Sequence, residues 1–176
     1  MDVLRELTES DVLHCARRKP CPTYTLRRAA RAVLLNARGE VALLRVARGG
    51  YHKLPGGGLE GMENPEEALR REVLEETGAR LVITGEVGNI VEYRDRFAQK
   101  QVSDCWLARL DGEPDEPCFT DSEREHGFEL VWVKLADAAD LLEADTPEDY
   151  VGCFIQLRDW LFLTQAQRIL AERNGD

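Results

Sequence analysis

The sequence predicts an α/β fold in which helices cover both faces of a β-sheet, that is, an α/β/α sandwich. Residues 29–36 and 41–46 have extended patterns that are apolar at successive positions, as in Val33-Leu34-Leu35. Such runs are typical of strands with both faces buried, whereas a half-exposed strand alternates. Helical patterns at residues 65–77 and near the C-terminus provide helices that could cover such a sheet.

The first 28 residues are predicted to be an extension before the domain. Thr8 or Ser10 could cap a short helix that reaches Arg17, and Pro20 and Pro22 would end it. This extension could pack on the domain and cover a sheet edge. A solvated arm and a segment that contacts substrate or a partner both remain open.

The rest of the chain, residues 29–176, is predicted to be a single domain. No internal repeat, low-complexity tract or second domain is visible. The turn at residues 38–40 would connect the first two strands as a hairpin or as consecutive strands. Further strands are expected at 51–54, 101–110 and 128–134, and extended structure at 81–84 and 87–93. A loop is expected at 111–121, a short helix at 136–143 and a long helix from Thr146 or Glu148 to Glu172.

The C-terminal helix has an unusually wide apolar face. From Tyr150 to Phe162 its apolar residues span about 160°, whereas a core-facing stripe spans about 100° or somewhat more. Trp160 and Leu163 lie outside even this arc, on the side expected to face solvent. Large exposed apolar residues tend to mark contact surfaces. Either a homodimer forms through this helix or residues 1–28 cover it.

Composition restricts the class of protein. The chain has 176 residues, of which 43% are hydrophobic and 32% charged, and these values suit a soluble domain. The net charge of −10 argues against nucleic acid as a partner. No apolar run is long enough to cross a membrane, and the charged N-terminus does not resemble a signal peptide. Five cysteines without a C-x-x-C motif favour free thiols and a cytoplasmic location.

The helix at residues 65–77 carries signals at both ends. Asn64 is a favourable N-cap, Pro65 suits the first helical position, and Glu67 completes a capping box. Gly78 is placed to end the helix in the left-handed conformation. The helix is preceded by Gly56-Gly57-Gly58, which would let the backbone approach a ligand closely.

This helix concentrates negative charge on one side. At about 100° per residue, Glu72, Glu75 and Glu76 share an arc of roughly 100°, separate from the apolar stripe of Leu69, Val73 and Thr77. No cation of the helix lies inside the acidic arc, and like charges four residues apart destabilise a helix. A divalent cation such as Mg²⁺ or Mn²⁺ would convert this repulsion into coordination. An ordinary acidic surface helix is the simpler alternative.

Residues 57–79 resemble the Nudix box, G-x5-E-x7-R-E-U-x-E-E-x-G-U, where U is aliphatic. The fixed positions match, and only Ala79 is smaller than the usual aliphatic residue. The resemblance implies a Nudix-type α/β/α sandwich with a central mixed sheet. The matching residues are Gly57, Glu63, Arg71, Glu72, Val73, Glu75, Glu76 and Gly78.

The resemblance also implies an activity: metal-dependent hydrolysis of the pyrophosphate bond in a nucleoside diphosphate linked to a group X. Glu72, Glu75 and Glu76 correspond to the metal ligands, Mg²⁺ or Mn²⁺ being the metal, and Glu72 and Glu76 are also assigned as catalytic. Gly57 would add a backbone carbonyl. Glu63 and Arg71 correspond to supporting residues, with Arg71 orienting the carboxylates by charge-assisted hydrogen bonds.

Residues outside the box complete the expected site. Many family members add an acidic residue from a loop before a late strand, and here that loop offers Glu125, favoured as catalytic, then Glu129 or Glu123. Arg45 and Lys53 could bind substrate phosphates. Each of these side chains could equally be an ordinary exposed residue.

Substrate identity is narrowed only by elimination. The proline, tryptophan or tyrosine signals of the ADP-ribose, NADH and dinucleotide subgroups are not found at clear spacing. The small-molecule substrate favoured is therefore a nucleoside triphosphate, ordinary or modified, which would be cut to the nucleoside monophosphate and inorganic diphosphate. A nucleotide-sugar or dinucleotide pyrophosphatase is the alternative, and a non-catalytic nucleotide-binding regulator is the alternative from another class.

Overall fold

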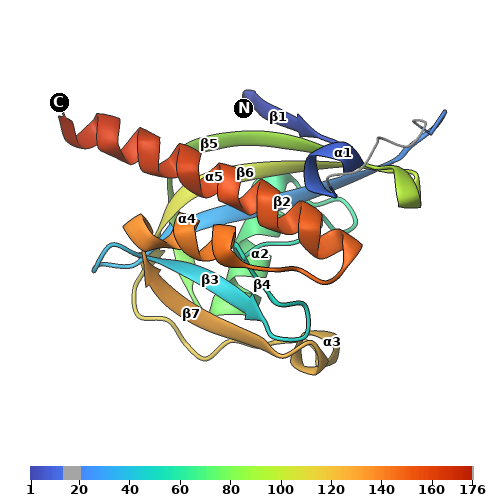
Figure 1. The fold of residues 1–176 in the computed structure, drawn as a ribbon. Helices are drawn as coiled ribbons and strands as arrows, with labels where there is room; N and C mark the ends of the chain where they lie inside the picture. The colour runs from blue at the N-terminus through green and yellow to red at the C-terminus, as the bar shows by residue number, and fades with distance from the viewer. Residues whose placement is uncertain (14–20, 176) are drawn as a thin grey trace.

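The computed structural model describes residues 1–13 and 21–175, and seven strands of these residues form one mixed sheet between helical layers (Figure 1). The strands are β1 (Val3–Leu7), β2 (Thr25–Leu35), β3 (Glu40–Val46), β4 (Tyr51–Lys53), β5 (Arg80–Arg94), β6 (Gln99–Asp111) and β7 (Phe128–Lys134). Their order across the sheet is β1-β5-β6-β2-β3-β4, and β7 also pairs with β3. The β1–β5 and β2–β6 pairs are parallel, and the others are antiparallel.

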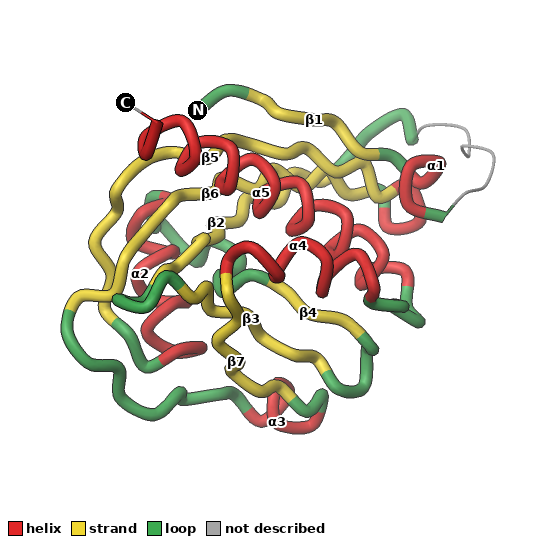
Figure 2. Tube along the Cα trace, turned by 60° about the vertical axis from the view of Figure 1, so that its left-hand side comes forward, coloured by secondary structure: helices red, strands yellow, loops and turns green. Residues whose placement is uncertain are grey.

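The helices lie on both faces of the sheet, as predicted. The longer helices are α2 (Pro65–Thr77), α4 (Leu135–Ala144) and α5 (Tyr150–Gly175), and the shorter ones are α1 (Glu9–Val12), α3 (Asp121–Glu125) and a 3₁₀ turn at Asp95–Phe97. Helix α2 lies behind the sheet in Figure 1, whereas α4 and α5 cross its front; the turned view in Figure 2 shows the same layers. The α/β/α sandwich is therefore confirmed.

Each face of the sheet has its own hydrophobic core. In β2, Val33 and Leu35 belong to the cluster under α4 and α5, whereas Ala32 and Leu34 belong to the cluster under α2. These side chains alternate between faces, and none is more than 7% exposed. The uninterrupted apolar run thus reflects two covered faces, which was the basis of the fold prediction.

Strand β5 is one long strand that contains both segments predicted to be extended, 81–84 and 87–93. Its register against β6 shifts between Ile83 and Gly85 and again between Glu86 and Gly88. Such β-bulges interrupt the alternation of side chains without ending the strand. At Gly88, φ is 144°, and an added Cβ would lie 2.5 Å from the Leu4 side chain of the neighbouring strand.

Strands β2 and β3 form only a minimal hairpin, because they share a single register pair, Leu35↔Val41. Instead, β2 pairs along its length with β6. Its other edge binds the glycine-rich loop: the amide of Ala30 donates to the Gly57 carbonyl at 2.9 Å and that of Ala32 to the Pro55 carbonyl at 3.0 Å. The loop that opens the box is thus fixed against a central strand.

The N-terminal residues add a strand at the edge of the sheet. Strand β1 pairs in parallel with β5, and Leu7 is 1% exposed in the core under α5. The expected helix from Thr8 or Ser10 is only Glu9–Val12, and its predicted end at Arg17 lies outside the described residues. Strand β2 begins at Thr25, so the predicted boundary at 28/29 falls inside it. The division into extension and domain stays a prediction.

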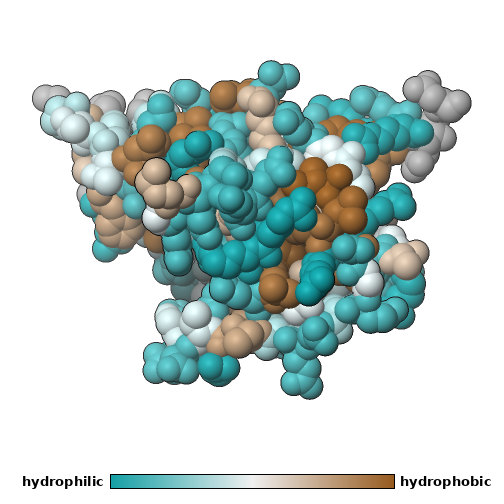
Figure 3. Space-filling model, turned by 180° about the vertical axis from the view of Figure 1, so that it is seen from behind, coloured by the Kyte–Doolittle hydropathy of each residue, from teal (hydrophilic) through white to brown (hydrophobic). Residues whose placement is uncertain are grey.

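Helix α5 does not expose the apolar patch that was predicted for it. Leu163 is fully buried, and Trp160 is partly buried against the same core, which Leu4, Leu7 and Val12 also join. Figure 3 shows the opposite face of the molecule, seen from behind, which is mostly hydrophilic with hydrophobic patches. Among the described residues no helix is both long and apolar enough to cross a membrane.

Candidate active site

The box helix has the boundaries that the sequence predicts. Asn64 accepts hydrogen bonds from the amides of Glu66 and Glu67, and the Glu67 carboxylate accepts from the amide of Asn64, so the capping box is complete. Gly78 ends the helix at φ 66°. The predicted stripe of Leu69, Val73 and Thr77 is buried against the sheet. The acidic arc is thereby turned away from the α2 core.

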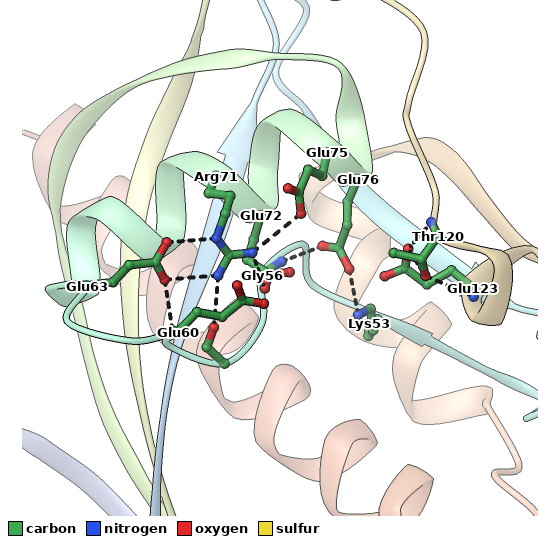
Figure 4. A network of polar contacts seen from close by, with 11 residues as sticks. Lys53, Gly56, Glu60, Glu63, Arg71, Glu72, Glu75, Glu76, Thr120 and Glu123 are labelled. Atoms are coloured by element: carbon green, nitrogen blue, oxygen red, sulfur yellow. Dashed lines mark hydrogen bonds and ion pairs between the residues drawn. The ribbon is translucent and has the colours of Figure 1, made fainter.

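Arg71 gathers three of the box carboxylates around one guanidinium (Figure 4). Its Nε and Nη2 donate to the two oxygens of Glu63 at 2.8 and 3.0 Å, a bidentate pair. Its Nη1 donates to Glu72 at 2.9 Å and to Glu75 at 3.4 Å, and Nη2 also reaches the Gly58 carbonyl at 3.1 Å. The Arg71 hydrogen bond lowers the pKa of Glu63 to about 2, assisted by the amide of Glu60. These contacts place Arg71 where it orients carboxylates, as the resemblance implies.

Glu76 is held separately and more deeply. Its side chain is 1% exposed; Oε1 accepts from Lys53 Nζ at 2.8 Å and Oε2 from the amide of Gly56 at 2.6 Å. Burial raises the pKa of Glu76, while the charge and hydrogen bond of Lys53 oppose that shift. The sequence showed no cation within the acidic arc, but β4 supplies one from outside the helix.

The oxygen atoms available at the box suit a hard divalent cation, although the structure does not bring the carboxylates together around one point. Among the described residues, no group of three or more His, Cys, Asp or Glu side chains is arranged to hold a metal. A Cβ on Gly57 would lie 2.2 Å from the Glu72 carboxylate, so only glycine lets this carboxylate approach the loop. The Gly57 carbonyl accepts from Ala30 and retains a second lone pair. Carboxylates and a carbonyl are the oxygen ligands that Mg²⁺ and Mn²⁺ take.

The predicted loop glutamates lie on and after α3. Glu123 is engaged in capping, since it accepts from the amide and hydroxyl of Thr120 at 2.8 and 2.9 Å (Figure 4). Glu129 pairs with Arg45 at 3.2 Å on the exposed surface. Glu125 is exposed at the end of α3. The segment borders the box, because the Phe128 ring lies 4.9 Å from Lys53 Nζ. The choice of Glu125 stays a prediction.

The two cations expected at substrate phosphates have partners in the protein. Arg45 is 54% exposed and bound to Glu129, whereas Lys53 is bound to Glu76. The structure thus brings Lys53 to the box but leaves Arg45 in an exposed ion pair with Glu129. Their role toward phosphate stays a prediction.

A buried polar network beside the box was missed by reasoning from the sequence. The Asp159 carboxylate accepts from the amide of Leu54 at 2.9 Å and from Arg158 Nε at 2.7 Å, and Arg158 Nη1 lies 3.5 Å from Glu92. This network joins the start of the glycine-rich loop to α5 and β5. Two features of the sequence could have indicated this network. One is the charged pair Arg158-Asp159 next to an apolar helical stripe, and the other is a lone Arg31 within an apolar strand.

A model of the NUDIX domain matches residues 25–152, which is most of the chain. The chain belongs to this family. It is accordingly a hydrolase that acts on pyrophosphate bonds in nucleoside diphosphate-X substrates. The box residues described above, from Gly57 to Gly78, lie inside the matched region, and Arg158 and Asp159 lie beyond it.

Solved structures agree with the Nudix fold. The ORF135 protein of E. coli is 19% identical with a TM-score of 0.60, covering 90% of this chain and 100% of its own. The MutT protein of Methanosarcina mazei Go1 is 21% identical with a TM-score of 0.56, covering 84% and 97%. A UDP-X diphosphatase is 18% identical with a TM-score of 0.54, covering 90% and 69%. At these identities the likeness shows the fold alone.

Proposed function

We propose that this Nudix hydrolase uses water to cut a nucleoside triphosphate, ordinary or modified, to the nucleoside monophosphate and inorganic diphosphate, and that it requires a divalent cation. The observation that carries the proposal is the Arg71 guanidinium, which holds Glu63 at 2.8 Å and Glu72 at 2.9 Å while Glu75 stays within 3.4 Å. Such an arrangement fixes acidic oxygens beside a glycine loop, which suits chemistry on a diphosphate.

Glu72, Glu75, Glu76 and the Gly57 carbonyl would hold the cation. When bound, a metal of this kind neutralises phosphoryl oxygens and lowers the pKa of a coordinated water. The protein's own contribution is positional. Arg71 limits the freedom of Glu72 and Glu75, and the Gly56 amide and Lys53 fix the Glu76 carboxylate. Glu125 is proposed as the base that takes a proton from the attacking water, since α3 leads directly into β7 beside Lys53.

A nucleotide-sugar or dinucleotide substrate is the second candidate. The likeness to a UDP-X diphosphatase supports the fold but not the substrate, because identity is only 18%. Both candidates contain the same diphosphate and differ in the group X. The choice between them therefore depends on parts of the site outside the box.

One experiment tests the proposal. Purified protein in Mg²⁺ or Mn²⁺ buffer is incubated with a panel of nucleoside triphosphates, oxidised purine nucleotides, nucleotide sugars and dinucleotides, and the products are separated. In ¹⁸O water one phosphate product should carry the label, and EDTA should abolish turnover. Turnover confined to nucleotide sugars or dinucleotides would select the second candidate. No turnover of any member would contradict the proposed function.

A further inference from the structure

Three arginines are buried under α5, beside the box. Arg31 on β2 is 5% exposed, Arg94 on β5 is 3% exposed and Arg158 on α5 is fully buried. Arg31 alternates with Ala30 and Ala32, which face α2, so its side chain lies on the α5 side of the sheet. A buried guanidinium is costly unless carboxylates and hydrogen-bond acceptors surround it.

Two of the three arginines have carboxylate partners. Arg158 donates to Asp159 at 2.7 Å and contacts Glu92 at 3.5 Å, and Arg94 donates to Glu92 at 3.0 Å. The Arg31 guanidinium has no hydrogen bond or ion pair with any residue of 1–13 or 21–175. Within these ranges the buried guanidinium nitrogens without a partner are Arg31 Nε and Nη1, Arg94 Nε and Arg158 Nη2.

Arg31 is also outside the ion pairs of this network. The carboxylates of Glu92 and Asp159 pair with Arg94 and Arg158, and both also accept from neutral donors, Gln101 and the amide of Leu54. Burial lowers the pKa of Arg31 to about 10, and the charge of Arg158 adds to this shift. Arg31 therefore remains protonated at neutral pH. The described residues thus leave the buried Arg31 guanidinium without an ion-pair partner, although the charges of Asp159, Glu76 and Glu72 act on it.

The position of Arg31 relates this charge to the box. A Cβ on Gly56 would lie 3.0 Å from the Cα of Arg31, so the loop passes directly over this residue. The same Gly56 donates to Glu76, and the charges of Glu76 and Glu72 act on Arg31. Arg31 thus lies between the carboxylates proposed to hold metal and the polar network under α5.

We propose that Arg31 binds a phosphoryl group of the substrate through its Nε and Nη1. A guanidinium presents paired N–H donors that match phosphoryl oxygens, and an anion would supply the hydrogen-bond acceptors that Nε and Nη1 lack. A phosphoryl group is the anion that the neighbouring box brings to this place, so the inference rests on the proposed function. Arg31 would therefore be a substrate-binding residue, whereas Lys53 and Arg45 already have carboxylate partners.

The test compares wild type, Arg31→Met and Arg109→Met for binding of inorganic pyrophosphate in metal-free buffer by calorimetry. Arg109 is an exposed arginine on β6, in register with Leu35 rather than with Arg31, and is the matched control. Arg31→Met should weaken binding by about 10- to 100-fold, the effect of losing hydrogen bonds to a charged group. Arg109→Met should bind within about twofold of wild type, the range for an uninvolved surface residue.

Thermal stability separates binding from a structural role. Without anion, Arg31→Met should melt at or above the wild-type temperature, because methionine removes an unpaired buried charge. Arg31→Lys keeps a positive charge but loses the paired N–H donors of the guanidinium, so it should bind pyrophosphate with intermediate affinity. No pyrophosphate binding by wild type, or wild-type affinity in both Arg31 variants, would overturn the inference. The substrate panel is independent of this outcome, because hydrolysis by wild type tests the proposed function alone.

Discussion

Glu76 is the least exposed carboxylate of the box, and both of its oxygens are already bound, to Lys53 and to the Gly56 amide. A glutamine at this position retains the shape and one acceptor oxygen but loses the charge. We expect Glu76→Gln to lower kcat at least about 10²-fold, the low end for loss of a catalytic charge or proton function. Steady-state kinetics on the best substrate of the panel, with defined metal content, measures this.

The control for that variant is Glu66→Gln, the same change in the exposed first turn of the same helix. Its kcat should stay within about twofold of wild type, as expected for a surface change far from the chemistry. Circular dichroism should show both variants folded. Near-normal turnover of Glu76→Gln would contradict its assignment to the metal site.

The Glu63–Arg71 pair predicts an acid-sensitive contribution to stability. The pKa of Glu63 falls from 4.5 to about 2 in the folded protein, mainly through the Arg71 hydrogen bond. Between these values the unfolded chain binds more protons, so lowering the pH favours unfolding. The contribution is therefore present above about pH 4.5 and is lost as the pH falls through about 2.

Denaturant unfolding of wild type and Glu63→Gln across this pH range tests that expectation. Wild type should be more stable near neutral pH, and the difference should shrink steadily below pH 4.5 because glutamine does not titrate. A difference that stays constant down to pH 2 would mean that the stabilisation does not depend on the ionised carboxylate.

At the scale of elements, the end of α2 is fixed by a close backbone contact. Gly78 has φ 66°, and an added Cβ would lie 1.9 Å from the Asp115 carbonyl. Gly39, in the turn before β3, has φ 74° but nothing within 4 Å of an added Cβ. Substituting alanine imposes the same left-handed strain at both positions, but only Gly78 adds a clash with the 112–120 loop.

We therefore expect Gly39→Ala to lower the free energy of unfolding by about 1 kcal/mol, the cost of a left-handed L-residue. Gly78→Ala should lower it by clearly more, about 2 kcal/mol or above, since the backbone of the loop must move. Chemical denaturation measures both. Equal losses of free energy of unfolding in the two variants would show that the 112–120 loop moves away without an energetic cost.

The box helix was predictable to the residue because its information is local. Asn64, Pro65, Glu67 and Gly78 lie within one segment and act through short-range capping. Residue partners far apart in sequence were not predictable in this way. Lys53 binds a glutamate 23 positions later, and the Leu54 amide binds an aspartate 105 positions later. The bulges of β5 were missed because a shift of register looks like a gap in the apolar pattern.

At the scale of the whole molecule, the N-terminal strand joins the sheet core. Leu7 on β1 is 1% exposed, whereas Val3 on the same strand is 58% exposed. Leu7→Ala should lower the free energy of unfolding by about 2–5 kcal/mol through the cavity it leaves. Val3→Ala should change it by about 0.5 kcal/mol at most. Equal small effects would mean that residues 1–13 are not part of the cooperative fold.

Pairing of two copies through α5 stays a prediction with a weaker basis, because Leu163 is buried within one chain. Light scattering at micromolar concentration decides it. A mass near 19.9 kDa is that of a single chain, and twice that value would indicate a dimer.

The contact between Asp159 and the Leu54 amide also has a consequence for biosynthesis. Translation delivers the box, from Gly57 to Gly78, about eighty residues before it delivers Asp159. A nascent chain can therefore form the capped box helix while its glycine loop still lacks the anchor from α5. A stop codon just after residue 152 would release a protein with every box residue in its sequence but without this anchor. For this enzyme, a segment synthesised later completes the support of a site that was encoded much earlier.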